Sequence, residues 1–166
     1  MTRRRLATLE IASARSGAVD DLALASKRFT SPDSLDAVHR LRRDCDAIII
    51  GVETIVRDNP SLTVRRIELG HGRQPVRIIL DRALRTPLDS TILADEHQTM
   101  IRHTEGEDGN ITALSSRENV EVVCMKSADS HNGVDLNRVL TLLGDREFQE
   151  IMVEGGAETA RRFLAA

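Results

Sequence analysis

The sequence predicts an α/β fold whose sheet is substantially parallel. Short apolar segments of strand length alternate with longer segments whose apolar residues repeat at helical spacing. Residues 47–50 are wholly apolar and too short for a surface helix, so we expect a strand buried on both faces, as in parallel sheets. With 166 residues and no internal repeat, the chain is expected to form one domain, 1–166, with a sizeable core.

The first elements are a strand and a helix. Residues 6–11 are predicted to form the strand. Ser31 can cap a helix and Pro32 suits the first helical position, so a helix is expected to begin there and to end near Arg43. Its predicted apolar face consists of Leu35, Val38 and Leu41, with Ala37 as a further candidate.

The central segment contains two buried strands. The strand at 47–50 is followed by Gly51, which allows a sharp turn, and then by a short helical segment at 53–56. The second buried strand covers residues 76–80. It ends at Asp81, whose side chain is expected to cap the next turn.

The remaining elements continue the alternation. Polar or glycine-bearing segments are expected to be loops, at 70–74 and 104–110. Apolar segments of strand length indicate three more strands, at 99–101, 120–125 and 151–153. Two helices are predicted, at 135–143, where Gly144 stops the helix, and at 157–164.

Composition and charge disfavour several classes of function. The net charge of −3 gives no general attraction to nucleic acid or anionic membranes, and without Trp or Tyr there are few stacking platforms for single-stranded nucleic acid. Cys45 and Cys124 are far apart and belong to no Cys/His cluster, so we expect two buried, reduced thiols and no metal site. With neither a membrane span nor a signal peptide, the expected location is the cytoplasm.

Charged and polar residues surround the predicted turn at Gly51. In open α/β sheets, ligands bind in the crevice outside the carboxyl ends of the strands. Arg42, Thr54, Asp58 and Arg65 are therefore expected at or near one edge of a site, where two arginines suit a phosphate. Taken alone, each of these residues also has a simpler interpretation, as an exposed arginine or as part of a turn.

A second glycine-bearing turn follows the last predicted strand. Gly155 and Gly156 would let a phosphate or a ribose approach the backbone, and the amides at the start of the next helix would bind an anion. Glu154 could hydrogen-bond to a ligand hydroxyl or amine. A tight turn and a solvated carboxylate explain the same residues about equally well, and no GxGxxG motif is present to indicate a Rossmann fold.

Taken together, these segments resemble a known family. The matching motifs are Val38-His39-Arg40-Leu41-Arg42, Gly51-Val52-Glu53-Thr54, Asp58-Asn59-Pro60, Leu62-Thr63-Val64-Arg65, the strand from Pro75 to Asp81 followed by Arg85-Thr86-Pro87, and Val153-Glu154-Gly155-Gly156. In this order they are similar to the reductase domain of riboflavin biosynthesis (RibD C-terminal type). The resemblance spans nearly the whole chain and implies a dihydrofolate reductase-like, three-layer α/β/α fold with a mostly parallel central sheet.

The resemblance also implies an activity and a homodimer. Members of the family use NADPH to reduce the ribosyl group of a ribosylaminopyrimidine 5′-phosphate to ribityl. By matching position, the residues facing the substrate would be Ser26, Arg42, Leu62, Arg65 and Glu154. Those facing NADPH would be Ser13, Thr54, Asp58, Arg82, Gly156, Ala157, Glu158 and Thr159.

Some features depart from the family pattern. A lysine that is common on the first strand of bacterial members is Glu10 here, which reverses a charge near the pyrimidine. Family members continue past the helix at 157–164 with further strands, so this domain is expected to be shortened at its carboxyl end and to lack them. Because no deaminase half with zinc ligands precedes it, the resemblance is expected to be closest to stand-alone 2,5-diamino-6-ribosylamino-4(3H)-pyrimidinone 5′-phosphate reductases. A non-catalytic nucleotide-binding or interaction module of the same fold is the alternative left open.

Overall fold

The computed structural model describes residues 6–11, 31–70, 72–125 and 134–165. The described strands form one six-stranded sheet in the order β1-β6-β2-β3-β4-β5, and each strand pair is parallel. The strands are β1 (Leu6–Glu10), β2 (Ala47–Gly51), β3 (Val76–Leu80), β4 (Thr99–His103), β5 (Val120–Cys124) and β6 (Glu150–Glu154). The predicted strands are all present, and the described sheet is parallel throughout rather than mostly parallel.

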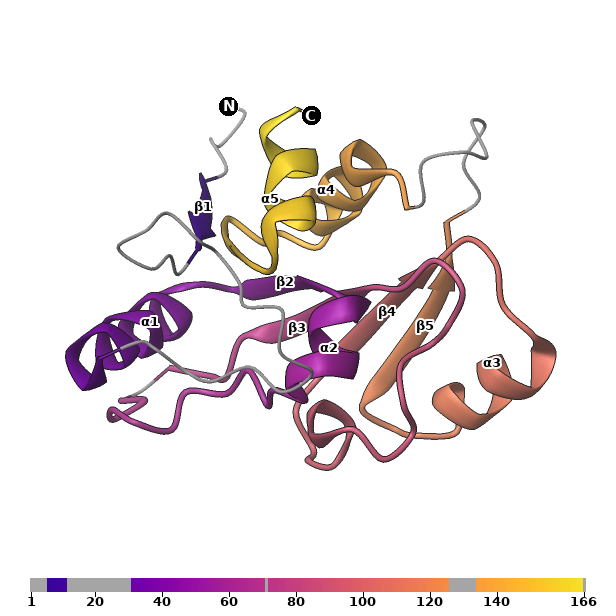
Figure 1. Ribbon diagram of the computed structural model, residues 1–166, viewed down its shortest axis with the longest axis horizontal. Coiled ribbons are helices and arrows are strands. Elements are labelled where there is room, and N and C mark those ends of the chain that lie inside the picture. Colours follow the sequence, from indigo (N-terminus) through magenta and orange to yellow (C-terminus); the bar gives the residue numbers. More distant parts are fainter. Residues whose placement is uncertain (1–5, 12–30, 71, 126–133, 166) are drawn as a thin grey trace.

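Helices cover both faces of this sheet (Figure 1). They are α1 (Pro32–Asp44), α2 (Val52–Asp58), α3 (Asp108–Ser115), α4 (Leu136–Asp145) and α5 (Ala157–Leu164), with a short 3-10 helix at Thr91–Leu93. Helices α4 and α5 pack on one face of the sheet, and α1, α2 and α3 pack on the other. The expected three-layer α/β/α architecture is therefore confirmed. Among the described residues, no helix has the length and apolar character needed to cross a membrane.

Strand β2 separates two apolar clusters of the core. Ile49 belongs to the cluster under α4 and α5, whereas Ile48 and Ile50 belong to the cluster on the opposite face. These three side chains are at most 1% exposed, which confirms a strand buried on both faces. Full burial of an isoleucine side chain contributes about 1.5–3 kcal/mol relative to its exposure to water. The position of β2, and of the turn that follows it, is therefore well fixed by packing.

The strand order creates a topological switch point beside β2. From β2 the chain proceeds outward through β3, β4 and β5, and then returns to place β6 on the other side of β2. The helices that follow these two neighbouring strands, α2 and α5, lie on opposite faces of the sheet. In open α/β sheets, a ligand crevice forms outside the carboxyl ends of the strands at such a point.

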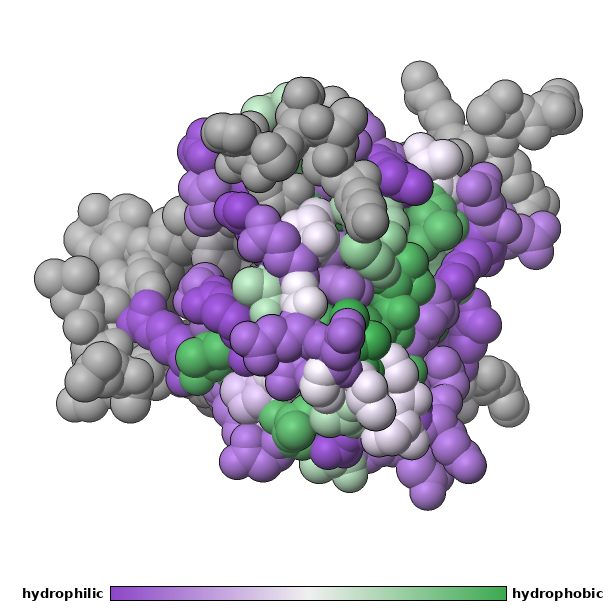
Figure 2. All heavy atoms as spheres, turned by 90° about the vertical axis from the view of Figure 1, so that its right-hand side faces the viewer, coloured by the Kyte–Doolittle hydropathy of each residue, from purple (hydrophilic) through white to green (hydrophobic). Residues whose placement is uncertain are grey.

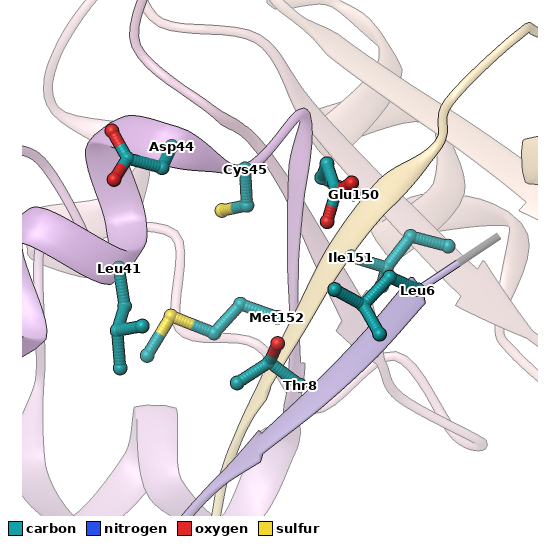
Figure 3. Close-up of a pocket in the computed structure, with 8 residues that line it drawn as sticks. All are labelled: Leu6, Thr8, Leu41, Asp44, Cys45, Glu150, Ile151 and Met152. Carbon is teal, nitrogen blue, oxygen red and sulfur yellow. The ribbon is translucent and has the colours of Figure 1, made fainter.

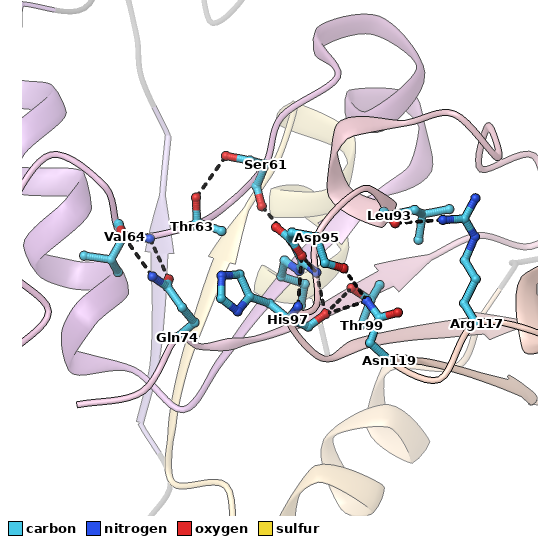
Figure 4. Close-up of polar contacts among 11 residues, drawn as sticks. Ser61, Thr63, Val64, Gln74, Leu93, Asp95, His97, Thr99, Arg117 and Asn119 are labelled. Carbon is cyan, nitrogen blue, oxygen red and sulfur yellow. Dashed lines mark hydrogen bonds and ion pairs between the residues drawn. The ribbon is translucent and has the colours of Figure 1, made fainter. Parts of the chain in front are cut away.

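A buried arginine near the start of β3 forms a hydrogen bond with the segment that follows α2. Arg77 is fully buried and donates to both carboxylate oxygens of Asp95 at 2.9 and 2.7 Å, and to the Ser61 carbonyl oxygen at 3.2 Å. Figure 4 shows how the same segment is held by Gln74, which accepts from the Val64 N–H at 2.7 Å and donates to the Val64 carbonyl at 2.9 Å. These bonds determine the course of residues 61–64.

Three predicted helix boundaries are wrong. Residues 104–110 are predicted to be a loop, but α3 begins at Asp108. Gly144 is predicted to stop the helix, but α4 continues through Asp145, because a single glycine inside a helix costs only about 1 kcal/mol. The turn comes instead at Glu147, where φ is 63°. Helix α2 covers seven residues and is longer than the predicted segment at 53–56.

The buried face of α1 also differs from the predicted one. Leu41 is 41% exposed, whereas His39 and Arg42 are buried. Both of these polar side chains form hydrogen bonds with residues outside the helix. The orientation of α1 therefore depends on polar partners as well as on apolar contacts.

Strand β5 lies at an edge of the described sheet. Figure 2 shows this side of the molecule, where apolar atoms gather in a band bordered by hydrophilic ones. On β5, Val122 and Val123 are half-buried and Cys124 is exposed. Both cysteines are free, but the prediction of two buried thiols is wrong, because Cys124 is on the edge strand and Cys45 is only half-buried.

Candidate functional site

Two glycine turns meet at the switch point between β2 and β6. A Cβ atom at Gly51 would lie 2.8 Å from Thr159 Oγ1, and a Cβ atom at Gly155 would lie 3.1 Å from Thr159 Cβ. Thr159 of α5 therefore contacts both turns. Gly156 precedes α5 without a side-chain cap, so the first amides of this helix are not covered by a capping side chain. A close approach to the backbone beside a helix N-terminus suits an anionic group of a ligand.

A buried ion pair lies beside these turns. Glu154, the last residue of β6, accepts from Nε and Nη2 of Arg42 at 2.6 Å each. Both side chains are 10% exposed. Arg42 Nη1 also donates to the Thr63 carbonyl oxygen at 3.4 Å, so this arginine joins α1, β6 and the segment after α2. Two residues predicted to face the substrate are thus in direct contact.

Glu10 belongs to the same charged cluster, although the sequence pattern does not mark it as a site residue. It lies opposite Glu154 in the register of β1 and β6. Burial raises the pKa of Glu10, the neighbouring Glu154 raises it further, and Arg42 opposes these effects. Two carboxyl groups and one guanidinium therefore share the ends of β1 and β6. The available signal in the sequence was the reversal of charge at Glu10 relative to the family.

The backbone between α2 and Arg65 adopts two left-handed conformations. Asn59 ends α2 with a φ of 44°, and Leu62 has a φ of 55°. Such a conformation costs a residue like leucine about 1–2 kcal/mol. The Leu62 side chain is only 2% exposed, and the bonds from Arg77 and Gln74 hold the residues beside it. Burial and these bonds offset the strain and fix the direction in which the chain leaves the core.

Arg65 is exposed, but its main chain is anchored to α1. Its amide donates to Nδ1 of the buried His39 at 3.2 Å, and its Nη1 donates to Ser61 Oγ at 2.5 Å. Burial, together with the positive charges of nearby arginines, Arg42 first among them, lowers the pKa of His39 to about 4. His39 is therefore a neutral acceptor near pH 7. It connects the segment that carries Arg65 with the helix that carries Arg42.

The neutral His39 is expected to make the stability of the fold dependent on pH. Its pKa is about 4 in the folded chain and about 6.5 when unfolded, so between these values only the unfolded chain binds the proton. The contribution of His39 is complete above pH 6.5 and decreases as the pH falls toward 4, by up to about 3 kcal/mol. The free energy of urea unfolding, measured from pH 4 to pH 7, tests this expectation.

His39→Asn is the matched variant for that measurement. Asparagine can still accept a hydrogen bond from the Arg65 amide, but it does not titrate. Its stability should therefore change less than that of the wild type across this pH range, while carboxyl groups such as Glu10 contribute equally to both proteins. Parallel stability curves for the two proteins would show that His39 is not the titrating group.

Other predicted cofactor residues belong to the segments that follow β2, β3 and β6. Thr54 is half-buried on α2, and Asp58 is exposed at the end of that helix. Arg82 follows β3 and is exposed, as is Glu158 in the first turn of α5. Ser13 and Ser26, and the side chain of Ala157, lie outside the part of the chain that the structure describes.

Asp81 shapes the turn that carries Arg82. Its fully buried carboxylate accepts from the amides of Arg85 and Thr86 at 2.9 and 2.7 Å. It also accepts from the Thr86 hydroxyl at 2.7 Å. The predicted capping role of Asp81 is confirmed, and it places Arg82 at the carboxyl end of β3.

A cavity of about 200 Å³ lies near the opposite end of the strands (Figure 3). Its lining residues come from β1, β6 and the end of α1, and they are Leu6, Thr8, Leu41, Asp44, Cys45, Glu150, Ile151 and Met152. The strand residues among them belong to the first parts of β1 and β6, so the cavity is separate from the turns at the switch point. Among the described residues, no group of three or more His, Cys, Asp or Glu side chains could hold a metal ion.

The three layers and the strand order, with its switch point between β2 and β6, are those of a dihydrofolate reductase-like α/β domain. The model of the RibD C-terminal domain matches residues 11–166. The chain therefore belongs to the RibD C-terminal domain family. Riboflavin biosynthesis protein RibD of Aquifex aeolicus is 36% identical over 157 residues, which make up 95% of this chain and 42% of that protein.

A second relative and a solved structure also match the chain. The 2,5-diamino-6-ribosylamino-4(3H)-pyrimidinone 5′-phosphate reductase of Methanothermobacter thermautotrophicus is 36% identical over 135 residues, 81% of this chain and 60% of that protein. The crystal structure of a diaminohydroxyphosphoribosylaminopyrimidine deaminase/5-amino-6-(5-phosphoribosylamino)uracil reductase from Thermotoga maritima matches with a TM-score of 0.73 and 27% identity, over 98% of this chain and 42% of that one. The chain thus spans about two fifths to three fifths of the length of these proteins.

Proposed function

We propose that this chain is an NADPH-dependent reductase of riboflavin biosynthesis that reduces the ribosyl group of a ribosylaminopyrimidine 5′-phosphate to ribityl. Family membership and the archaeal relative, which is named as a reductase of such a phosphate, support this function. The proposal includes a single reductase domain over residues 1–166, a cytoplasmic location and, as in the family, a homodimer.

The observation that carries the proposal is the meeting of charged groups and glycine turns at one switch point. The Arg42–Glu154 pair ends β6, and α5 begins within three residues of it, next to Gly51. A dinucleotide requires close access to the backbone, and a substrate phosphate requires cationic side chains. Gly51 lets these two turns meet, because a Cβ atom there would lie 2.8 Å from Thr159 Oγ1 at the start of α5.

In this proposal each group of residues has a distinct task. The substrate is bound by Ser26, Arg42, Leu62, Arg65 and Glu154, and the cofactor by Ser13, Thr54, Asp58, Arg82 and residues 156–159. When bound, NADPH supplies a hydride to C1′ of the imine that forms when the ribose ring opens, and a proton is added to the imine nitrogen. The chain itself orients the reactants and provides fixed charges around them. Arg42 holds the Glu154 carboxylate in one orientation, in which it can accept a hydrogen bond from the substrate.

Oxidation of NADPH by the purified chain in the presence of the pyrimidine phosphate tests this function. Arg65→Ala is expected to raise KM about 10- to 100-fold, because a charge-assisted contact to the substrate phosphate is lost. Its affinity for NADPH should be unchanged. Arg73→Ala is the matched control, since the Arg73 side chain is 71% exposed and pairs with Asp46, just before the start of β2, and its kinetics should equal those of the wild type.

The same assay distinguishes the alternative function. A non-catalytic nucleotide-binding or interaction module would leave NADPH unoxidised in the presence of the pyrimidine phosphate, whether or not the cofactor raises the melting temperature. At about 100 times the Kd, specific binding of NADPH should stabilise the fold by roughly 2.7 kcal/mol. If Arg65→Ala and Arg73→Ala have equal kinetics, the role given to Arg65 is wrong.

A further inference from the structure

An exposed ion pair bridges the carboxyl ends of β3 and β4. Arg82 donates through Nε and Nη2 to Glu105 Oε1, at 3.2 and 2.7 Å. The two side chains are 48% and 56% exposed, so a ligand from solvent can reach both. Both hydrogen bonds end on the same carboxylate oxygen, which leaves Oε2 of Glu105 outside the pair.

The main chain holds the two residues next to each other. The Arg82 carbonyl oxygen accepts from the amides of Thr104 and Glu105, at 3.1 and 2.8 Å. A Cβ atom at Gly106 would overlap the Leu84 side chain, so the turn after Glu105 packs directly against the turn after Arg82. The ion pair is therefore part of two interlocked turns rather than a chance meeting of two long side chains.

These turns lie on the same edge of the sheet as the glycine turns at Thr159. The strands follow in the order β6-β2-β3-β4, and they are all parallel, so their carboxyl ends form one row. With about 4.8 Å between neighbouring strands, the row from β6 to β4 is about 14 Å long. This is comparable to the length of an extended dinucleotide. A dinucleotide with one end at α5 would bring its other end to Arg82 and Glu105.

We propose that Glu105 is a specificity-determining residue for the adenosine ribose of the nicotinamide cofactor. A guanidinium binds a 2′-phosphate, whereas a carboxylate accepts a hydrogen bond from a free 2′-hydroxyl and repels the phosphate. Because Glu105 is paired with Arg82, it reduces the attraction of this arginine for a 2′-phosphate. The pair therefore lowers the preference for NADPH over NADH below the preference that Arg82 alone would give. This inference rests on the proposed function.

Titrations with 2′,5′-ADP and 5′-AMP test the inference, because these probes differ only in the 2′-phosphate. In Glu105→Gln the charge is removed and the size is kept, so affinity for 2′,5′-ADP should rise about three- to fivefold while affinity for 5′-AMP changes little. Arg82→Gln should change the preference in the opposite direction. Asp44→Asn is the matched control, because Asp44 forms an exposed ion pair with Arg43 on α1 and should leave the preference unchanged.

The outcomes separate the inference from the proposed function. A higher ratio of NADPH to NADH affinity in Glu105→Gln, which diminishes as salt is added, supports the role of Glu105. An unchanged ratio in a variant that binds both cofactors overturns this role and leaves the reductase function intact. If the folded wild-type chain binds neither NADPH nor NADH, the proposed cofactor site is wrong and the inference fails with it.

Discussion

Arg42→Met is expected to destabilise the fold by about 3–5 kcal/mol and to lower turnover at least about 100-fold. Arg42 and Glu154 are joined by two hydrogen bonds of 2.6 Å and are both 10% exposed. Without the guanidinium, the Glu154 carboxylate stays buried without its cation, and Glu10 lies beside it in the register of the sheet. Urea unfolding measures the first effect, and NADPH oxidation measures the second.

The chain provides a neighbouring arginine as a control. Arg43 is 38% exposed and pairs with the exposed Asp44, so Arg43→Met should change stability by less than about 0.5 kcal/mol. The double variant Arg42→Met/Glu154→Leu removes both buried charges and should recover part of the lost stability, but none of the lost turnover. If Arg42→Met is as stable as Arg43→Met, the buried pair does not support the fold.

The fold could be predicted in large part because its strands have a strong local signal. Residues 47–50 are wholly apolar and residues 76–80 are apolar apart from Arg77; both segments have strand length, and both are observed as strands. Helix α3 was missed because its apolar pattern is weak, with Leu114 as its one buried residue. The end of α4 was misplaced because Gly144 is tolerated inside the helix, which depends on packing that the local sequence does not reveal.

The partners within the candidate site are less accessible to sequence reasoning. Arg42 and Glu154 were both singled out as charged residues, but they are 112 positions apart and their pairing depends on how α1 crosses β6. Glu10 enters the cluster only through the register of β1 against β6. The role of His39 cannot be predicted from sequence, because a histidine on a helix does not indicate that its Nδ1 will accept from a distant amide. Long-range contacts, rather than residue types, define this site.

Gly51→Ala is expected to weaken NADPH binding about tenfold or more while the fold is largely retained. The backbone of Gly51 has a φ of −83° and a ψ of 147°, which alanine adopts without strain. The added Cβ atom would lie 2.8 Å from Thr159 Oγ1, so Thr159 and the start of α5 must move away. Overpacking of this kind costs about 1–3 kcal/mol. Because the proposed cofactor site needs α5 in its original position, this cost reduces the free energy of NADPH binding, and 1.4 kcal/mol corresponds to a tenfold change in Kd.

Thr159→Ala decides whether this contact is the cause. Thr159 Oγ1 is the atom that the new methyl group would approach, so its removal makes room for this methyl group in the double variant Gly51→Ala/Thr159→Ala. The double variant should then bind NADPH about as well as Thr159→Ala alone, even if Thr159 itself contributes to binding. Isothermal titration of the four proteins gives the coupling between the two positions. Independent effects of the two substitutions would mean that NADPH binding does not depend on the fit between the β2 turn and α5, and the position proposed for the cofactor would have to be abandoned.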